Sequence, residues 1–165
     1  SPQRPLKILF LGQVIIRKGI AAIFEAIALL TDYPLEFWFV GEVKVKPPQT
    51  LIKHPQIKWF GAVSRNTTNY YYQQADVFLF PTHSDGFGLT QLEAQSWKLP
   101  LIVSQFCGAV VKEQNNGLIL PHITGKAIAE ALIFCLHNPQ ELAKFSHNST
   151  QILPAFSLDQ LAEKL

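Results

Sequence analysis

The sequence predicts an α/β domain with a Rossmann-like, doubly wound parallel sheet and helices on both faces. Two observations carry this prediction. Short β-rich runs alternate with longer segments whose apolar residues recur at helical spacing, which is typical of a parallel sheet built from strand–helix–strand units. The strand-like runs are also continuously apolar, as strands covered on both faces are. A length of 165 residues suits one domain of roughly 100–200 residues.

The elements of the first half follow in a regular order. Residues 7–12 form a continuous apolar run and predict the first strand. A helix is expected over residues 18–30, and the segment from Thr31 to Pro34 ends it. Residues 35–41 predict a second buried strand. A loop opens at Lys46, and residues 56–61 predict a third, shorter strand.

The second half continues the alternation. A helix over 66–74 is followed by a strand over 77–80, and a helix from about 87 to 97 by a strand over 99–104. A last short strand is expected over 117–120. Helices over 125–137 and 139–148 and a closing helix that Ser157 begins complete the chain. No internal repeat, low-complexity tract or interdomain linker interrupts this order. The sequence therefore predicts one domain over residues 1–165.

Composition excludes several classes of protein. Hydrophobic residues make up 48% of the chain and charged residues 16%, so a disordered polyampholyte is excluded. A net charge of +2 gives no general attraction to nucleic acid or to a membrane surface, so any anion site has to be local. No apolar run approaches the roughly 20 residues of a spanning helix. We expect a cytoplasmic protein, with membrane association at an inner face only through parts outside this chain.

Two further observations concern compartment and completeness. The two cysteines, Cys107 and Cys135, are too few for a disulfide framework and are expected to be core thiols. The chain contains no methionine, even at position 1. We therefore expect it to be a piece of a longer protein.

The first candidate site is the loop from Gly12 to Gly19, which runs from a strand into a helix. The two glycines let the backbone approach a ligand, while Arg17 and Lys18 place two cations at the mouth, as a phosphate site requires. A plain strand–helix turn with solvated cations fits the segment equally well. The loop is not a GxGxxG sequence, which argues against a dinucleotide dehydrogenase.

A second candidate loop, with Gly86 and Gly88, enters the next helix. Glycines at a helix entrance leave backbone N–H groups available to a diphosphate or to sugar hydroxyls. Asp85 and Glu93 lie eight residues apart, and both carboxylates can face the same cleft. In the alternative interpretation, Asp85 only caps the helix and Glu93 is an exposed helix residue.

The third candidate is the corner at Phe60 and Gly61, after a strand and before a helix. Its backbone edge could contact a planar base, but an ordinary corner with an aromatic core residue fits as well. The five histidines show no metal-ligand spacing, so no metal site is expected. The Tyr70–Tyr72 run is expected to spread around one helix, half in the core and half at its rim.

Taken together, these loops resemble the C-terminal, nucleotide-binding half of GT-B retaining glycosyltransferases, the glycosyl transferases group 1 family (family 4). Five collinear motifs carry the resemblance and cover almost the whole chain. They are residues 9–19 (family pattern F-x-G-R-x-x-x-x-K-G), 59–61 with 75–81, 85–94 (the E-x7-E motif), 99–104, and 116–121. The resemblance implies one half of a GT-B fold.

The resemblance also implies roles for the matching residues. Lys18 would contact the diphosphate of a nucleotide sugar and stabilise the departing nucleoside diphosphate. Glu93 would hold the ribose hydroxyls, and Asp85 would touch the transferred sugar, so these three are the implied catalytic residues. The other implied donor contacts share loop or helix-entrance positions: Gly12, Gln13, Arg17, Phe60, Gly61, Phe87, Gly88, Leu89 and Thr90.

The implied reaction transfers a sugar from a UDP- or GDP-sugar to a saccharide or lipid-linked acceptor, with retained anomeric configuration. It needs no cofactor and no obligatory metal. The acceptor would be bound by an N-terminal domain absent from this chain, so this donor-binding domain should be inactive alone. No nucleic-acid partner is implied.

Several positions depart from the family pattern. Gln13 stands where the family has a phosphate-binding arginine, and Asp85 where it has glutamate. Trp97 and Lys98 replace a small Cys-Gly pair, and Ala109-Val110 replaces Pro-Glu. These departures motivate a second hypothesis, a degenerate nucleotide-sugar-binding or scaffolding module without catalysis.

Overall fold

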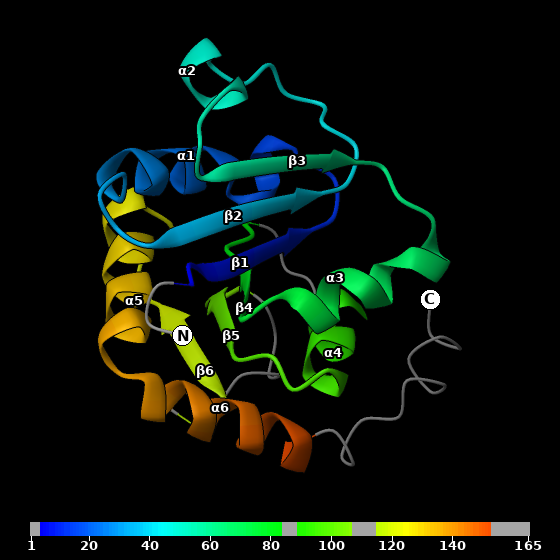
Figure 1. Ribbon diagram of the computed structural model, residues 1–165, viewed down its shortest axis with the longest axis vertical. Helices are drawn as coiled ribbons and strands as arrows, with labels where there is room; N and C mark the ends of the chain where they lie inside the picture. The colour runs from blue at the N-terminus through cyan, green and yellow to red at the C-terminus, as the bar shows by residue number, and fades with distance from the viewer. Residues whose placement is uncertain (1–3, 84–88, 107–114, 153–165) are drawn as a thin grey trace.

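Six parallel strands form one sheet in the order β3-β2-β1-β4-β5-β6 (Figure 1). The computed structural model describes residues 4–83, 89–106 and 115–152. The strands, all of them short, are β1 (Leu6–Leu11), β2 (Leu35–Val40), β3 (Ile57–Gly61), β4 (Val77–Phe80), β5 (Leu101–Ser104) and β6 (Gly117–Leu120). The predicted doubly wound parallel sheet is confirmed.

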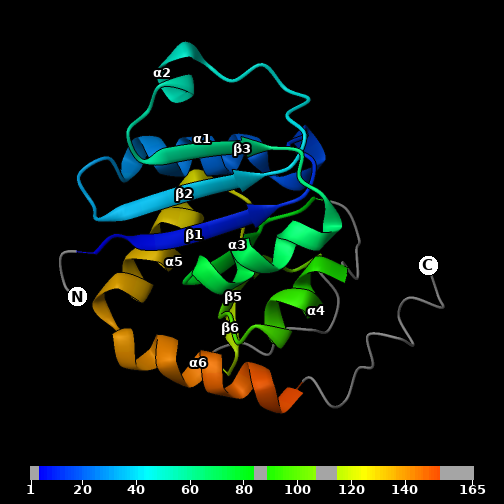
Figure 2. The same ribbon diagram turned by 45° about the vertical axis from the view of Figure 1, so that its right-hand side comes forward.

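Helices cover both faces of this sheet (Figure 2). The helical segments, including two single 3₁₀ turns, are η1 (Ile16–Lys18), α1 (Ile20–Leu29), α2 (Gln49–Ile52), η2 (Arg65–Thr67), α3 (Thr68–Gln74), α4 (Leu89–Ser96), α5 (Gly125–His137) and α6 (Pro139–Ile152). One core cluster joins α1 and α5 to the sheet, and a second joins α3 and α4 to it. Each face of the sheet therefore has its own apolar layer.

Several element boundaries differ from the prediction. The first helix begins at Ile20 instead of residue 18, because Gly19 adopts a left-handed φ of 77° after the 3₁₀ turn η1. The expected loop after Lys46 contains the short helix α2, which follows Pro48. Helix α6 reaches Ile152. The predicted closing helix from Ser157 lies outside the described residues.

The third predicted helix also begins later than expected. Residues 65–67 form the 3₁₀ turn η2, so α3 starts at Thr68 instead of residue 66. The hydroxyl of Thr67 donates to the carbonyl of Ser64 (2.8 Å), and that of Thr68 to the carbonyl of Arg65 (2.8 Å). These local hydrogen bonds compete with the α-helical pattern and tighten the turn.

The strand order reverses beside β1, because β2 and β3 lie on one side of it and β4 to β6 on the other. In open parallel sheets, ligands bind at such a switch point, outside the carboxyl ends of the strands. Gly12 and Gly41 follow β1 and β2 with φ values of 143° and 146°. A Cβ at Gly41 would overlap the carbonyl of Gly12, so glycine lets these two strand ends approach each other.

Candidate functional site

Glu93 lies on α4 with both carboxylate oxygens held by the protein. The Tyr72 hydroxyl donates to Oε2 at 3.0 Å, and the Arg65 guanidinium lies 3.3 Å from Oε1. The Glu93 side chain is 22% exposed, whereas that of Arg65 is 77% exposed. Glu93 is therefore a positioned carboxylate and not a solvated residue of the helix surface.

Tyr72 is a core residue that holds the carboxylate of Glu93 in place. Its side chain is 1% exposed, and its ring packs 6.2 Å from that of Phe78. Burial raises the pKa of Tyr72 above its ordinary value, and the charge of Glu93 and the hydrogen bond to it raise this pKa further. The hydroxyl consequently stays protonated and acts as a donor to Glu93. The predicted spread of the tyrosine run is confirmed, since Tyr70 is 54% exposed and Tyr71 half-buried.

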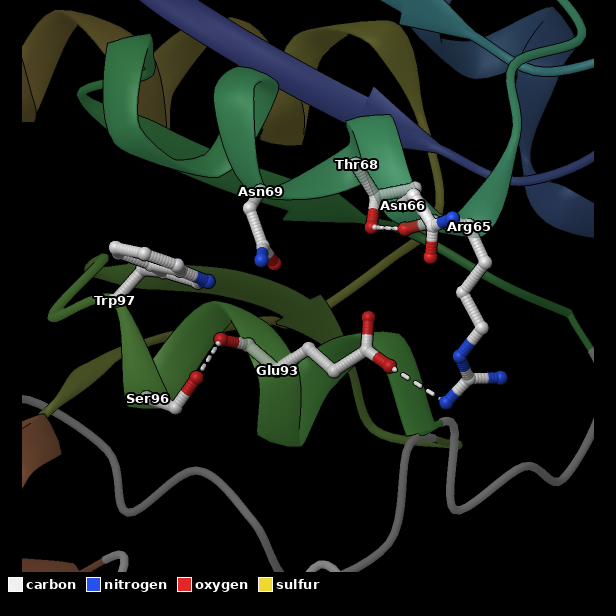
Figure 3. Close-up of a pocket in the computed structure, with 7 residues that line it drawn as sticks. All are labelled: Arg65, Asn66, Thr68, Asn69, Glu93, Ser96 and Trp97. Carbon is white, nitrogen blue, oxygen red and sulfur yellow. Dashed lines mark hydrogen bonds and ion pairs between the residues drawn. The ribbon is translucent and has the colours of Figure 1, made fainter.

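A cavity of about 510 Å³ opens beside Glu93, between α3 and α4 (Figure 3). Its lining is mostly polar and comprises Arg65, Asn66, Thr68, Asn69, Glu93, Ser96 and Trp97. Its volume lies within the range of about 300–1,000 Å³ that is typical of small-ligand pockets. The Ser96 hydroxyl donates to the backbone carbonyl of Glu93 at 2.6 Å, and both residues line the cavity.

The loop after β1 is tied to the loop after β4. The carbonyl of Arg17 accepts hydrogen bonds from the backbone N–H of His83 (2.7 Å) and from the hydroxyl of Thr82 (3.1 Å). The Ser104 hydroxyl, at the end of β5, donates to the carbonyl of Thr82 at 2.6 Å. These bonds connect the carboxyl ends of three strands and fix the backbone that carries the candidate cations.

Lys18 lies at the same edge of the sheet. Its ammonium group lies 5.1 Å from the ring centre of Phe80, the last residue of β4. Gly19 packs so closely on the carbonyl of Pro81 that a Cβ there would overlap it. The loop is therefore pressed against the end of β4, and Lys18 is held beside the last residue of that strand.

A second, smaller cavity of about 220 Å³ lies at the carboxyl ends of β1, β2 and β3. Gly12 and Gln13 line it together with Ala62 and Val63, and Thr68 lines both cavities. The two hollows are therefore neighbours. The structure thus brings the first and third candidate loops to one edge, next to the cavity that Glu93 lines.

Phe60 is held within the aromatic packing. Its ring centre lies 5.0 Å from that of Trp38 and 4.9 Å from that of Tyr71. The carbonyl of Gly61 accepts a hydrogen bond from the N–H of Gly41 at 2.8 Å. A planar ligand would therefore meet this corner through backbone or small side chains, and not by stacking on Phe60.

The second candidate loop is described only from its helical end. Asp85, Phe87 and Gly88 lie outside the described residues, and α4 begins at Leu89. The carbonyl of Thr90 lies 3.4 Å from the Tyr72 hydroxyl, within reach of a weak hydrogen bond.

Sequence reasoning missed four of the side chains around Glu93. Arg65, Asn69 and Tyr72 lie on η2 and α3, 21 to 28 residues before Glu93, and no sequence spacing connects them to it. Only Trp97 could have been found from the sequence, because it follows Glu93 by four residues and residues four apart share a helix face.

Other expectations concern metal, cysteine and membrane. Among the residues that the structure describes, no three histidine, cysteine or carboxylate side chains gather as metal ligands would. Cys135 is buried as predicted, and burial raises the pKa of its thiol to about 12, whereas Cys107 lies outside the described residues. Across residues 4–83, 89–106 and 115–152, no helix has both the length and the hydropathy that a membrane span requires.

Comparison with protein families gives one match over nearly the whole chain. The model of the family "Glycosyl transferases group 1" matches residues 1–152. The capsular polysaccharide biosynthesis glycosyltransferase CapM of Staphylococcus aureus is 25% identical over 149 residues, which cover 84% of this chain and 39% of CapM. The chain thus spans about two fifths of the length of this relative.

Solved structures share the fold. The C-terminal domain of the glycosyl transferase group 1 family protein LpcC from Francisella tularensis superimposes with a TM-score of 0.79 at 21% identity, covering 93% of this chain and 87% of that one. Anabaena HepE, solved in complex with UDP and glucose, superimposes with a TM-score of 0.81 at 17% identity, covering 99% of this chain and 49% of HepE.

Proposed function

The chain belongs to the glycosyl transferases group 1 family, and we propose that it is the donor-binding domain of a retaining glycosyltransferase. The reaction moves a sugar from a UDP- or GDP-sugar to a saccharide or lipid-linked acceptor, in polysaccharide or glycoconjugate synthesis. One observation carries the proposal: Glu93 is held by Tyr72 and Arg65 at a polar cavity beside the sheet's switch point.

The chemistry of this edge suits a nucleotide sugar. A carboxylate with fixed oxygens accepts hydrogen bonds from two neighbouring ribose hydroxyls. The ammonium group of Lys18 offers a positive charge to the diphosphate and stabilises the negative charge of the leaving group. Asp85 contacts the transferred sugar. The UDP and glucose named in the HepE structure support a donor of this class.

Gln13, which replaces the arginine of the family pattern, removes one positive charge from the proposed phosphate site. Gln13 lines the smaller cavity and offers an amide in place of a guanidinium. Arg17 is the nearest other cation along the chain, and its side chain is exposed while its carbonyl is bound. Arg17 therefore supplements Lys18 from the outer side of the loop.

The acceptor is bound by a second domain of the parent protein. This proposal agrees with the match to only 39% of CapM. The active site then lies between the two domains, so the present chain binds a donor without transferring its sugar. We place the parent protein in the cytoplasm, with any association with the inner face of a membrane arising through the part outside this chain.

Calorimetric titration of UDP and GDP tests donor binding. At least one of the two should bind, and Lys18→Ala and Glu93→Ala should each weaken its binding at least tenfold, or about 1.4 kcal/mol. Lys53→Ala and Glu130→Ala are matched controls, since both remove an exposed charge away from the cavities. If the wild-type chain binds neither nucleotide, the scaffolding hypothesis replaces this one.

A transfer assay tests whether sugar transfer needs the second, acceptor-binding domain. The chain alone should release no sugar to any acceptor, whereas the intact parent protein should do so with its preferred donor. Sugar transfer by the 165-residue chain alone would refute the proposed need for a second domain.

A further inference from the structure

Another cavity, of about 500 Å³, lies at the amino ends of the strands, opposite to the candidate donor site. Three parts of the fold enclose it: the segment that leads into β1, the turn between α1 and β2, and the corner between α5 and α6. Figures 1 and 2 both show these three segments together at the left of the molecule. The volume lies within the range of about 300–1,000 Å³ that is typical of small-ligand pockets. The cavity shares no lining residue with the two hollows at the carboxyl edge.

The wall of this cavity is mostly apolar. Leu6 of β1, Leu136 of α5 and Leu142 of α6 pack against the core cluster and stay half-buried. The other apolar lining residues are Pro34, Cys135 and Pro139. An apolar ligand group that covers the three leucines would remove their remaining exposed surface from water, which is favourable.

Three polar side chains line the same cavity, namely those of Arg4, Tyr33 and His137. One guanidinium nitrogen of Arg4 donates to Asp76 at 2.8 Å, and the other N–H groups of the guanidinium remain for a further partner. Within the described part of the chain, no residue hydrogen-bonds the hydroxyl of Tyr33 or the imidazole of His137. Hydrogen-bond donors and one positive charge therefore meet the apolar wall.

No carboxylate opposes a negative charge inside the cavity. Among the described residues that line it, none is aspartate or glutamate. The partner of Arg4, Asp76, is not a lining residue, and its second oxygen accepts a 2.8 Å hydrogen bond from the backbone N–H of Lys7. An arginine held in this way on one side can bind a second carboxylate on the other.

We propose that this cavity is a binding site for a small amphipathic anion, a medium-chain alkyl carboxylate. The alkyl chain lies against Leu6, Leu136 and Leu142, and the carboxylate accepts hydrogen bonds from Arg4 and Tyr33. The site goes beyond the proposed donor binding and does not depend on it.

Both halves of such a ligand are needed. A short anion would leave the leucines uncovered, and a cationic amphiphile would place its charge beside the guanidinium of Arg4. The chain length and the sign of the charge are therefore the two properties that an experiment should vary.

Calorimetric titration of the 165-residue chain with octanoate, hexanoate, acetate and octyltrimethylammonium varies both properties. Octanoate should bind one to a chain, and each CH₂ added between hexanoate and octanoate should tighten binding roughly two- to fourfold. Acetate and octyltrimethylammonium should show no measurable binding. UDP should not displace octanoate, because the two sites lie at opposite ends of the strands.

Variants and NMR locate the bound octanoate. Arg4→Gln should weaken its binding roughly tenfold, and Tyr33→Phe, which keeps the ring, should weaken it several-fold. Lys126→Gln is the matched control for Arg4→Gln, since it removes an exposed charge that lines no described cavity. Circular dichroism checks that each variant is folded. The backbone amides that respond to octanoate should lie at residues 33–34 and 135–142.

Several results would overturn the site. They are an absence of octanoate binding, an unchanged affinity in folded Arg4→Gln, equal binding of octanoate and octyltrimethylammonium, and amide changes at residues 12–19 and 90–97 with displacement by UDP. Failure of the chain to bind UDP or GDP would instead reject the proposed function and leave this site standing, because the octanoate experiment needs no nucleotide.

Discussion

The hydroxyl of Tyr72 donates a 3.0 Å hydrogen bond to the carboxylate of Glu93 and thereby connects the core beneath α3 to the candidate donor site on α4. The donor is 1% exposed, whereas the acceptor lines a cavity. Because the tyrosine ring cannot move without disturbing the core, the position of Glu93 is set by packing as well as by its ion pair with Arg65.

Replacement of Tyr72 by phenylalanine tests this connection. Tyr72→Phe removes the hydroxyl and keeps the ring, so it should lower the free energy of unfolding by about 1 kcal/mol and weaken UDP or GDP binding several-fold. Urea denaturation and calorimetry measure the two effects. Tyr70→Phe is the control, since Tyr70 is exposed and should change neither quantity. Unchanged nucleotide affinity in Tyr72→Phe would show that Glu93 needs no positioning.

The same pair predicts a dependence of stability on pH. The folded chain holds the phenolic proton of Tyr72 more tightly than the unfolded chain, because burial and Glu93 raise its pKa. This contribution is complete below about pH 10, where tyrosine is protonated in both states, and declines as the pH rises above that value. The free energy of unfolding should therefore fall more steeply above about pH 10 in the wild type than in Tyr72→Phe. Equal slopes would contradict the assignment.

Two glycines with similar backbone angles should respond differently to alanine. Gly19 has a φ of 77° and lies against the carbonyl of Pro81, whereas Gly61 has a φ of 71° with open space where a Cβ would lie. Gly61→Ala should cost about 1 kcal/mol for the left-handed conformation. Gly19→Ala should cost about 3 kcal/mol or more, because steric overlap adds to that cost. Equal losses in urea denaturation would mean that the loop does not press on β4.

Lys98 occupies a position that favours glycine. Its φ is 63°, and the N–H groups of Lys98 and Leu99 donate to the carbonyls of Gln95 and Ala94, which is the Schellman pattern at the end of α4. Lys98→Gly should therefore raise the free energy of unfolding by about 0.5–1 kcal/mol. Lys144→Gly, inside α6, should lower it by about 1 kcal/mol. A loss of stability in Lys98→Gly would contradict the left-handed cap.

The sheet was predictable because its strands are strongly marked. Val77–Phe80 and Gly117–Leu120 have the predicted bounds, since each is an apolar run beginning or ending beside proline, glycine or a polar residue. Helix α2 was missed because its four residues show no periodicity. The 3₁₀ turn before α3 depends on the hydroxyls of Thr67 and Thr68, whose partners a pattern of hydrophobicity does not reveal.

The site was predictable only in part. The loop glycines and Glu93 were found from motifs along the chain, because each motif depends on residues that are close together in the sequence. The partners of Glu93 could not be found in this way, since Arg65 and Tyr72 meet it only through the packing of α3 against α4. The corner at Phe60 was expected to contact a base through its backbone edge, but the packing of its ring against Trp38 and Tyr71 could not be predicted, because these neighbours come from other elements.

The most direct test of a donor site at the carboxyl edge of the sheet is to locate the residues that a nucleoside diphosphate contacts. Titration of the isotope-labelled chain with UDP or GDP, followed by NMR of its backbone amides, locates the contact. We expect the largest shift changes at residues 12–19 and 90–97, with little change around Cys135 and Pro139, which line a cavity at the opposite end of the strands. Changes concentrated around Cys135, or none at all, would contradict a donor site at the carboxyl edge of the sheet.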